Sequence, residues 1–357
     1  MGDFDLNQVT TKPAETQTAR NPSGFKNTKL SVLIFLGILI VLGILTYLVF
    51  SLKYRNRSEY LTIGYSQTET FSLVNLSKSQ GYFDEQGVMV DTRSFKDDND
   101  VLKAFVEDKI DMAVVEDVSA ALNYRELEGV KLVASIAQAD TYFFVLDLKQ
   151  GLTQIKHIEG NTIGIPDNEN AQYWFERSVS VSAIKKEDVK LKVLNQKKLA
   201  SELATGRVAG IITNQPYVYR AIVYERSEKQ VQQFRAQDSL SVFTVLLVKE
   251  DYLMNNSKAV KDFLTTLKKA EAYIEKEPEE SKQFFAVDWS ESSAYVDTVT
   301  KDTKFKLQMT GELQESISAA YSWKTSKRSA STTSEFNLDS LYYVNILREV
   351  SPESVMF

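Results

Sequence analysis

The sequence has no cysteine and only one histidine, His157, among its 357 residues. Without cysteine there are no disulfide bonds, no thiolate metal sites and no cysteine nucleophile. A single histidine leaves almost no material for a histidine metal site or a catalytic triad. We therefore expect no catalytic residue, no metal site and no cofactor.

The sequence also lacks the short motifs that bind nucleotides and calcium. No Gly-x-Gly-x-x-Gly, Walker or serine-elbow motif is present. The acidic run at residues 97–100 resembles a calcium loop only superficially, because the EF-hand glycine and closing glutamate are missing. The net charge is −6 and no basic stripe is present, so nucleic acid is not an expected partner.

The overall composition is that of a globular protein. Hydrophobic residues make up 43% of the chain and charged residues 25%, which allows a large core. A chain of this length holds two domains of ordinary size or one bilobed unit.

The amino-terminal region changes abruptly in character at residue 30. Residues 1–29 are polar and are predicted to form a disordered tail. Residues 30–50 are an uninterrupted apolar run, which as a helix spans roughly 30 Å, the thickness of a bilayer core. The run is longer than the apolar part of a signal peptide, and no small-residue cleavage site follows it. We expect a transmembrane anchor, with a linker at residues 51–60.

The charges beside this run do not give its orientation. Basic residues are equally frequent before it and after it, at Arg20, Lys26, Lys29, Lys53, Arg55 and Arg57. The positive-inside rule is therefore a tie.

Residues 61–115 alternate between apolar strand patterns and helix patterns. The expected order is strand, helix, strand, helix, strand, at residues 61–65, 71–80, 88–90, 101–106 and 110–115. A glycine, Gly81, ends the first helix, a tight connection covers 82–87, and residues 97–99 offer N-caps for the second helix. This order predicts a parallel α/β sheet, in which ligands bind beyond the carboxyl ends of the strands.

Two polar segments follow strands of this unit. The first has hydroxyls and amides at a helix start, which can hold a ligand or simply cap the helix through Thr68 or Thr70: Ser66, Gln67, Thr68, Glu69 and Thr70. The second is Glu116 and Asp117, where either side chain faces a cleft or Asp117 caps the next helix. Both segments are candidate ligand contacts.

Five segments in order resemble the type II solute-binding proteins of ABC importers, in the branch of sulfonate, taurine, nitrate and thiamine-precursor binders. The segments are residues 81–88, 101–115, 158–166, 203–217 and 248–280. The resemblance implies a two-lobed, hinged α/β fold over residues 61–357. Lobe one is expected at about 61–141 and 245–357, and lobe two at about 142–244.

The resemblance also places further candidate contacts. Asp140 and Thr141 lie near the crossing between the lobes. In lobe two, the turn at Asp167, Asn168 and Asn170 stands where sulfonate and nitrate binders usually have small residues. The two acids of this turn, Asp167 and Glu169, disfavour an anionic ligand, unless the turn is a solvated loop outside the cleft.

A second turn of lobe two also departs from the family's pattern. Asn214 and Gln215, followed by Tyr217, replace an aromatic–acid–proline contact. The alternative is a plain helix start with Pro216 at its first position.

The resemblance implies a membrane-tethered binding protein that captures a small organic solute and delivers it to an ABC permease and its ATPase. It places the binding domain on the extracytoplasmic side of the cell membrane. The alternative is a sensory or structural ectodomain of the same fold. If the acidic residues of these turns face the cleft, their charge favours a cation or a polar ring over an anion as the ligand; these residues are Glu69, Glu116, Asp117, Asp167 and Glu169. Such a ligand would stack on Tyr65, Tyr173 and Trp174. An enzyme is not expected.

Overall fold

The computed structural model describes residues 34–47, 60–67, 69–223, 230–237, 239–327 and 337–357. The chain divides into two units, Met1–Asn56 and Arg57–Phe357. In the first unit, residues 34–47 form a helix with exposed side chains. No helix within the described residues is both long and apolar enough to cross a membrane. The predicted tail, both ends of the predicted span 30–50 and the predicted linker up to residue 59 lie outside the described residues.

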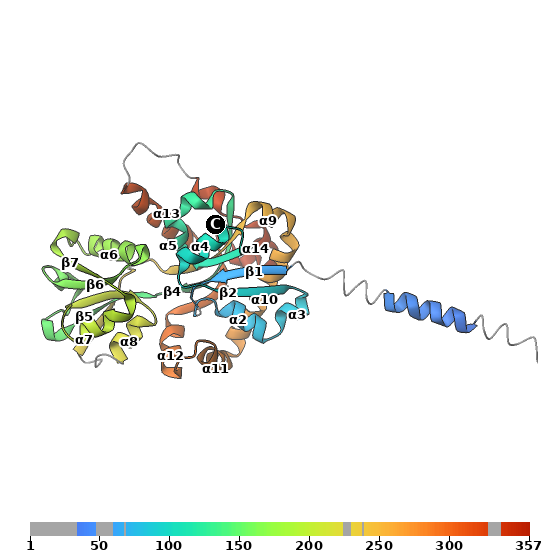
Figure 1. Cartoon of the computed structure of the whole chain (residues 1–357), viewed down its shortest axis with the longest axis horizontal. Helices are drawn as coiled ribbons and strands as arrows, with labels where there is room; N and C mark the ends of the chain where they lie inside the picture. The colour runs from blue at the N-terminus through green and yellow to red at the C-terminus, as the bar shows by residue number, and fades with distance from the viewer. Residues whose placement is uncertain (1–33, 48–59, 68, 224–229, 238, 328–336) are drawn as a thin grey trace, which may run out of the picture. The chain divides into compact units, whose positions relative to one another are not determined.

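The second unit contains two β-sheets, one in each lobe (Figure 1). The lobe-one sheet has the strand order β11-β4-β10-β3-β1-β2. Its strands are β1 (Tyr60–Tyr65), β2 (Met89–Ser94), β3 (Met112–Glu116), β4 (Val130–Ala139), β10 (Val242–Lys249) and β11 (Thr303–Gln308). The lobe-two sheet has the order β7-β6-β8-β5-β9. Its strands are β5 (Tyr142–Asp147), β6 (Thr162–Pro166), β7 (Lys190–Leu194), β8 (Gly210–Asn214) and β9 (Val231–Arg235).

Helices cover both sheets. Lobe one carries α2 (Ser72–Ser79), α3 (Tyr82–Gln86), α4 (Asp98–Val106), α5 (Asp117–Leu122), α9 (Glu250–Asn255), α10 (Ser257–Lys276), α11 (Pro278–Asp288), α12 (Ser293–Lys301), α13 (Gly311–Ser326) and α14 (Asn345–Val350). Lobe two carries α6 (Glu169–Val181), α7 (Leu199–Ala204) and α8 (Tyr217–Val223). Short 3-10 helices lie at Tyr124–Leu127, Leu148–Gln150, Ile155–Ile158, Lys186–Asp188, Gln196–Lys198, Leu338–Leu341 and Pro352–Ser354.

The strand pairing confirms the predicted two-lobed α/β fold. Strand β1 runs parallel to both β2 and β3, as the alternating pattern of residues 61–115 predicts. Strand β10 runs antiparallel between β3 and β4, so the chain returns from lobe two into the middle of the first sheet. The carboxyl ends of β1 and β3 therefore meet at one edge, which faces lobe two.

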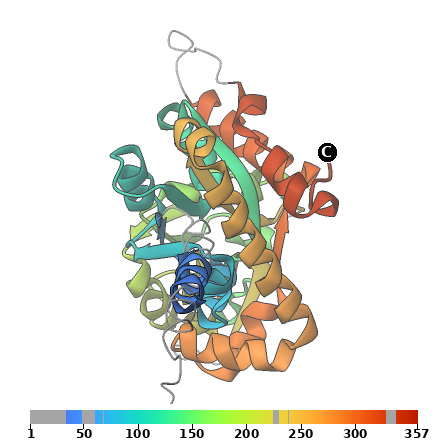
Figure 2. The ribbon, with the colours of Figure 1, turned by 90° about the vertical axis from the view of Figure 1, so that its right-hand side faces the viewer.

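Local sequence signals set several element ends. Gly81, with φ of 74°, follows α2 in the left-handed conformation that glycine adopts without strain. The Asp97 side chain accepts a hydrogen bond from the Asp100 amide at 3.1 Å and so caps α4. Helix α10 buries Val260, Phe263 and Leu264 and packs against α2 and α3 (Figure 2).

The apolar side chains on the two faces of the lobe-two sheet belong to two different core clusters. Alternate residues of β5 point to opposite faces, as strand geometry requires. Phe144 joins the large cluster that continues through lobe one, whereas Phe143 and Val145 join a smaller cluster under α7 and α8. The lobes thus share one continuous apolar core on the α6 side.

Three local features differ from what the sequence patterns indicated. Residues 82–86 form the short helix α3 rather than a tight connection, anchored by the buried Phe83. Helix α2 is not capped by Thr70, because Phe71 occupies the N-cap position and makes no side-chain cap bond. Strand β11 was not predicted, although the alternation of Phe305 and Leu307 with polar residues is typical of an edge strand.

Candidate functional site

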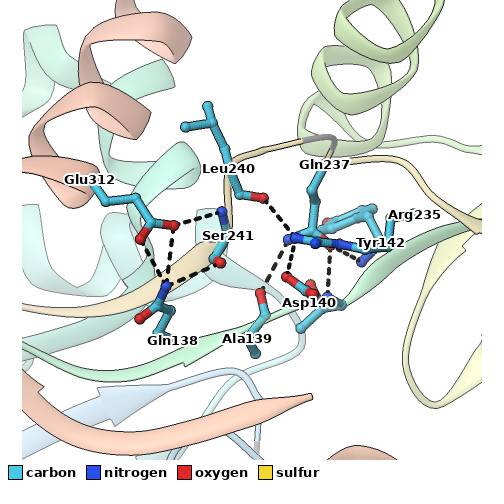
Figure 3. A network of polar contacts seen from close by, with 10 residues as sticks. Gln138, Ala139, Asp140, Tyr142, Arg235, Gln237, Leu240, Ser241 and Glu312 are labelled. Atoms are coloured by element: carbon cyan, nitrogen blue, oxygen red, sulfur yellow. Dashed lines mark hydrogen bonds and ion pairs between the residues drawn. The ribbon is translucent and has the colours of Figure 1, made fainter.

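The two lobes are joined by two crossings that lie side by side. The first passes from β4 to β5 through Asp140 and Thr141, and the second passes from β9 to β10. The buried Gln237 of the second crossing ties them together (Figure 3). Its Oε1 accepts from the amides of Thr141 at 2.9 Å and Tyr142 at 3.0 Å, and its Nε2 donates to the Ala139 carbonyl at 3.1 Å.

Further polar contacts hold each crossing in place. Arg235 donates to Asp140 Oδ1 at 2.6 Å on the lobe-two side. On the lobe-one side, the Gln138 amide donates to both carboxylate oxygens of Glu312 at 3.1 Å, and the Ser241 amide donates to the same carboxylate (Figure 3). These contacts brace the two crossings against each other, and we call this connection between the lobes the hinge.

Glu116 lies where the lobes meet. It ends strand β3 and is only 2% exposed. Its Oε1 accepts from Gln67 Nε2 at 2.7 Å, and Gln67 comes from the turn after β1 in the same lobe. Its Oε2 accepts from Asn170 Nδ2 at 2.7 Å, and Asn170 lies in the first turn of α6 in lobe two. One buried carboxyl group therefore links the two lobes directly.

A second carboxyl group, that of Asp98, holds the backbone of Glu116 in place. Asp98 Oδ2 accepts from the Glu116 amide at 2.8 Å and from Ser119 Oγ at 2.6 Å, and Oδ1 accepts from the Ser66 hydroxyl. Asn170 also donates to Ser119 Oγ at 2.7 Å. We call these residues, Ser66, Gln67, Asp98, Glu116, Ser119 and Asn170, the central cluster.

The electrostatics of the central cluster follow from burial. Loss of solvent raises the pKa of Glu116 to about 8, and the negative charge of Asp98 adds to the effect, while the hydrogen bonds from Gln67 and Asn170 oppose it. Burial also raises the pKa of Asp98. Two carboxyl groups this close do not both ionise easily, so the pair retains a proton near neutral pH.

Asp117 plays a structural part. It is fully buried, and its Oδ1 accepts from the Phe243 amide of β10 at 3.1 Å. Burial raises the pKa of Asp117 to about 7. The adjacent Glu116 occupies the N-cap position of α5 without a side-chain cap bond. Asp117 is therefore not the N-cap residue that the alternative proposed, and of the two acids it is Glu116 that contacts lobe two.

A small cavity opens beside the hinge, next to the central cluster. Its volume is about 20 Å³, enough for one water molecule. Six predicted residues line it: Gln67, Glu69, Thr70, Asp140, Thr141 and Gln215. Four more come from the α12–β11 region, which was not among the predicted site segments: Thr298, Val299, Asp302 and Thr303. We call this space the hinge cavity.

A family model described as NMT1/THI5 like matches residues 70–281, more than half of the chain. The chain belongs to the NMT1/THI5-like family. No curated protein sequence matches it.

Solved structures share the fold of this NMT1/THI5-like chain at low identity. One is the periplasmic sulfonate-binding protein SsuA from Methylobacillus flagellatus KT, with a TM-score of 0.69 and 14% identity, covering 84% of this chain and 95% of that one. Another is the periplasmic aliphatic sulphonate binding protein SsuA from Escherichia coli, with a TM-score of 0.65 and 15% identity, covering 76% and 93%. A third is the periplasmic nitrate-binding protein NrtA from Synechocystis PCC 6803, with a TM-score of 0.63 and 12% identity, covering 83% and 89%.

The remaining predicted site residues that the structure of this NMT1/THI5-like chain describes lie outside the hinge cavity and the central cluster. Asp167 is exposed, and Asn168 caps α6 by accepting from the Ala171 amide at 2.7 Å. Asn214 accepts a hydrogen bond from Gln196, and Tyr217 lies 5.6 Å from the Arg220 guanidinium. Thr68 lies outside the described residues. Within those residues, no group of three or more acidic or histidine side chains is arranged to hold a metal ion.

The lobes also contact each other at the surface. On one side, Lys324 of α13 pairs with Glu169 of α6 at 2.6 Å, and Lys327 pairs with Glu176 at 2.9 Å. Trp323 Nε1 donates to Glu176 at 3.0 Å, and its ring packs edge-on against Tyr173. We call these residues, Glu169, Tyr173, Glu176, Trp323, Lys324 and Lys327, the outer clasp.

A separate surface contact lies beyond the hinge cavity. Arg220 of α8 pairs with Glu291 at 3.0 Å, and Tyr219 packs edge-on against Tyr295. The Tyr295 hydroxyl donates to Glu69 at 2.8 Å, so this contact continues to the wall of the hinge cavity. The lobes therefore meet at the central cluster, at the outer clasp and beside α8.

Proposed function

We propose that this chain is the substrate-binding component of an ABC-type importer, which captures a small organic solute between its lobes. The observation that carries the proposal is the meeting of Glu116 from lobe one with Asn170 from lobe two, beside a braced hinge. The NMT1/THI5-like family and the names of the solved sulfonate- and nitrate-binding proteins support it. No chemical transformation is part of the proposal.

A bound solute would replace the direct contacts between the lobes with contacts to itself. Opening the hinge separates Asn170 from Glu116 and exposes amides, carboxyls and hydroxyls at the carboxyl ends of the lobe-one strands. A solute that bridges these groups would draw the lobes together again. Such closure around a ligand is a common hinge motion, and the closed form would be presented to a permease and its ATPase.

The proposal includes a membrane tether at residues 30–50. The length and apolar character of this run support a span, and its lack of a cleavage site supports retention in the mature protein. The binding lobes would then lie on the extracytoplasmic side of the cell membrane. Amino-terminal sequencing of the native protein tests this, because a terminus after residue 50 would contradict the tether.

A sensory or structural ectodomain is the second candidate. The direct contact of the lobes at the central cluster favours it, because closure itself can be a signal to a partner. The two candidates differ in their partners. A permease and an ATPase encoded beside this gene would favour the importer.

The test of binding uses the absence of cysteine. Lys103→Cys on α4 and Lys190→Cys on β7 place one label on each lobe, and both positions are exposed. A thermal-shift screen of the full chain in detergent identifies a ligand, since saturation at about 1,000 Kd adds roughly 4 kcal/mol of stability. We expect that ligand to change the distance between the labels.

The control is the same labelled pair carrying Asn170→Ala, in which the contact between lobes at Glu116 is lost. We expect its label distances to spread before ligand is added. A stabilising ligand that leaves the distance in the parent protein unchanged would contradict hinge-linked binding.

A further inference from the structure

The hinge cavity is lined by acids without a lining base. Glu69, Asp140 and the exposed Asp302 are the acidic residues of its lining, and neither lysine nor arginine lines the cavity within the described part of the chain. Arg235 pairs with Asp140 at 2.6 Å and offsets that charge. Two acids remain: among the described residues, neither Glu69 nor Asp302 forms an ion pair. The nearby Lys301 and Lys304 are exposed and do not line the cavity.

A buried hydroxyl group also lacks a partner here. Thr141 lines the cavity and is 7% exposed, yet its Oγ1 has no hydrogen-bond partner. Buried polar groups are almost always hydrogen-bonded in native proteins. Parting of the lobes would let a ligand group reach this hydroxyl and supply the missing bond, and a threonine hydroxyl accepts readily from an ammonium group. This observation is independent of the acids and points to the same cavity.

The donors that would hold an anion are already in use. Gln67 Nε2 and Asn170 Nδ2, one from each lobe, both donate to the protein's own carboxyl group at Glu116. An anionic solute would have to displace this group and would lie beside Asp98 as well. A cation meets less competition, because Glu69 accepts from the Tyr295 hydroxyl through Oε1 and keeps Oε2 for a ligand, and acceptors also remain at Asp302 and Thr141.

From these observations we infer that the cleft takes a small organic cation, with its ammonium group directed to Glu69 and Asp302. This inference rests on the proposed binding function and specifies the charge of the solute. The Thr141 hydroxyl would accept a further ammonium hydrogen, and so would the Gln215 side-chain oxygen beside the bond that it accepts from the Tyr219 amide at 3.2 Å. Because the cavity now holds only about 20 Å³, the lobes must part to admit such a solute.

The test measures the potential in the cavity with reactive probes of opposite charge. Thr298→Cys in the full chain places a single thiol on the cavity wall, at a half-buried position. The thiol reacts with trimethylammonioethyl or sulfonatoethyl methanethiosulfonate, forming a mixed disulfide and releasing methanesulfinate. We expect the cationic reagent to react at least about tenfold faster than the anionic one, relative to the same ratio for 2-mercaptoethanol.

The matched control adds Glu69→Gln and Asp302→Asn, which keep the side-chain shapes and remove the charges. We expect the preference to fall toward the 2-mercaptoethanol ratio. Thr303→Cys serves as a second reporter if Thr298→Cys disturbs α12. An equal or faster reaction with the sulfonate reagent overturns the inference. A thiol that reacts with neither reagent also overturns it, because small solutes then do not reach the cavity.

This result separates the charge of the solute from the binding function. A sulfonate preference, together with an interlobe distance that responds to a ligand, would reject the cation and keep the proposed function. A cation preference without any ligand-dependent distance change would reject the proposed function instead.

Discussion

The central cluster and the outer clasp connect the same two lobes in chemically different ways. Glu116 is 2% exposed and is held by neutral amide donors from both lobes. In the clasp, the Lys324 side chain is 19% exposed and its partner Glu169 is 40% exposed. When a buried hydrogen bond is broken, the polar group that remains has neither a protein partner nor water. When an ion pair that solvent can reach is broken, water hydrates the remaining charge. We therefore expect the central cluster to control closure and the clasp to adjust it.

The largest effect is expected from Glu116→Ala. The substitution leaves the Gln67 amide without its acceptor and removes one of the two acceptors of Asn170, which keeps Ser119 Oγ; a buried polar group left unpaired costs about 1–3 kcal/mol. We expect the closed form to weaken by that order. The distance between labels at positions 103 and 190, measured at pH 6, should lengthen and broaden.

Glu116→Gln is the matched control for this substitution. It resembles the protonated carboxyl group and keeps an acceptor for one of the two amides. We expect it to retain most of the closed population at pH 6. If Glu116→Ala leaves the distances unchanged, the central cluster does not hold the lobes together.

The second effect is a dependence of stability on pH. The pKa of Glu116 is raised to about 8 and that of Asp117 to about 7, from ordinary values of 4.5 and 3.8. A raised pKa of an acid contributes stability that is complete below its ordinary value and is lost as pH rises through the folded value. We expect the free energy of unfolding to fall by about 2 kcal/mol or more between pH 5 and pH 8, since one pKa unit is about 1.4 kcal/mol.

Urea unfolding at pH 5, 6.5 and 8 measures this slope. Glu116→Gln combined with Asp117→Asn should flatten it, because neither amide titrates. Glu202, whose pKa is lowered to about 2 by Arg207 and Lys192, contributes in the opposite direction but only below about pH 4.5. Stability that stays constant or rises from pH 5 to pH 8 would contradict the burial of these carboxyl groups.

Sequence patterns predicted the strands and turns that carry the central cluster better than they predicted the contacts within it. The alternation in residues 61–65 and 110–115 placed Glu116 at the carboxyl end of a buried strand, and the β1 turn put Gln67 at the same edge. Asn170 was also selected, but together with Asp167, which is exposed. They lie three positions apart, and the cap at Asn168 sets which one faces lobe one.

Other site residues gave no local signal. Asp98 looks like a helix-capping residue in the sequence, but Asp97 caps the helix and Asp98 supports Glu116 instead. Asp302 and Thr298 reach the hinge cavity from a segment more than 150 residues beyond the hinge crossing at Thr141. Contacts of such separation depend on how the lobes pack, which neither periodicity nor turn chemistry encodes.

The smallest effect is expected at the outer clasp. Lys324→Met removes the pair with Glu169 while keeping much of the apolar stem, and an ion pair that water partly reaches contributes about 0.2–1 kcal/mol. We expect a slight broadening of the interlobe distance at low salt and none at about 1 M salt, where screening acts within roughly 3 Å. Lys185→Met is the control, because Lys185 is exposed and forms no ion pair among the described residues. A loss of closure as large as that of Glu116→Ala would mean that the clasp, rather than the buried carboxyl group, holds the lobes together.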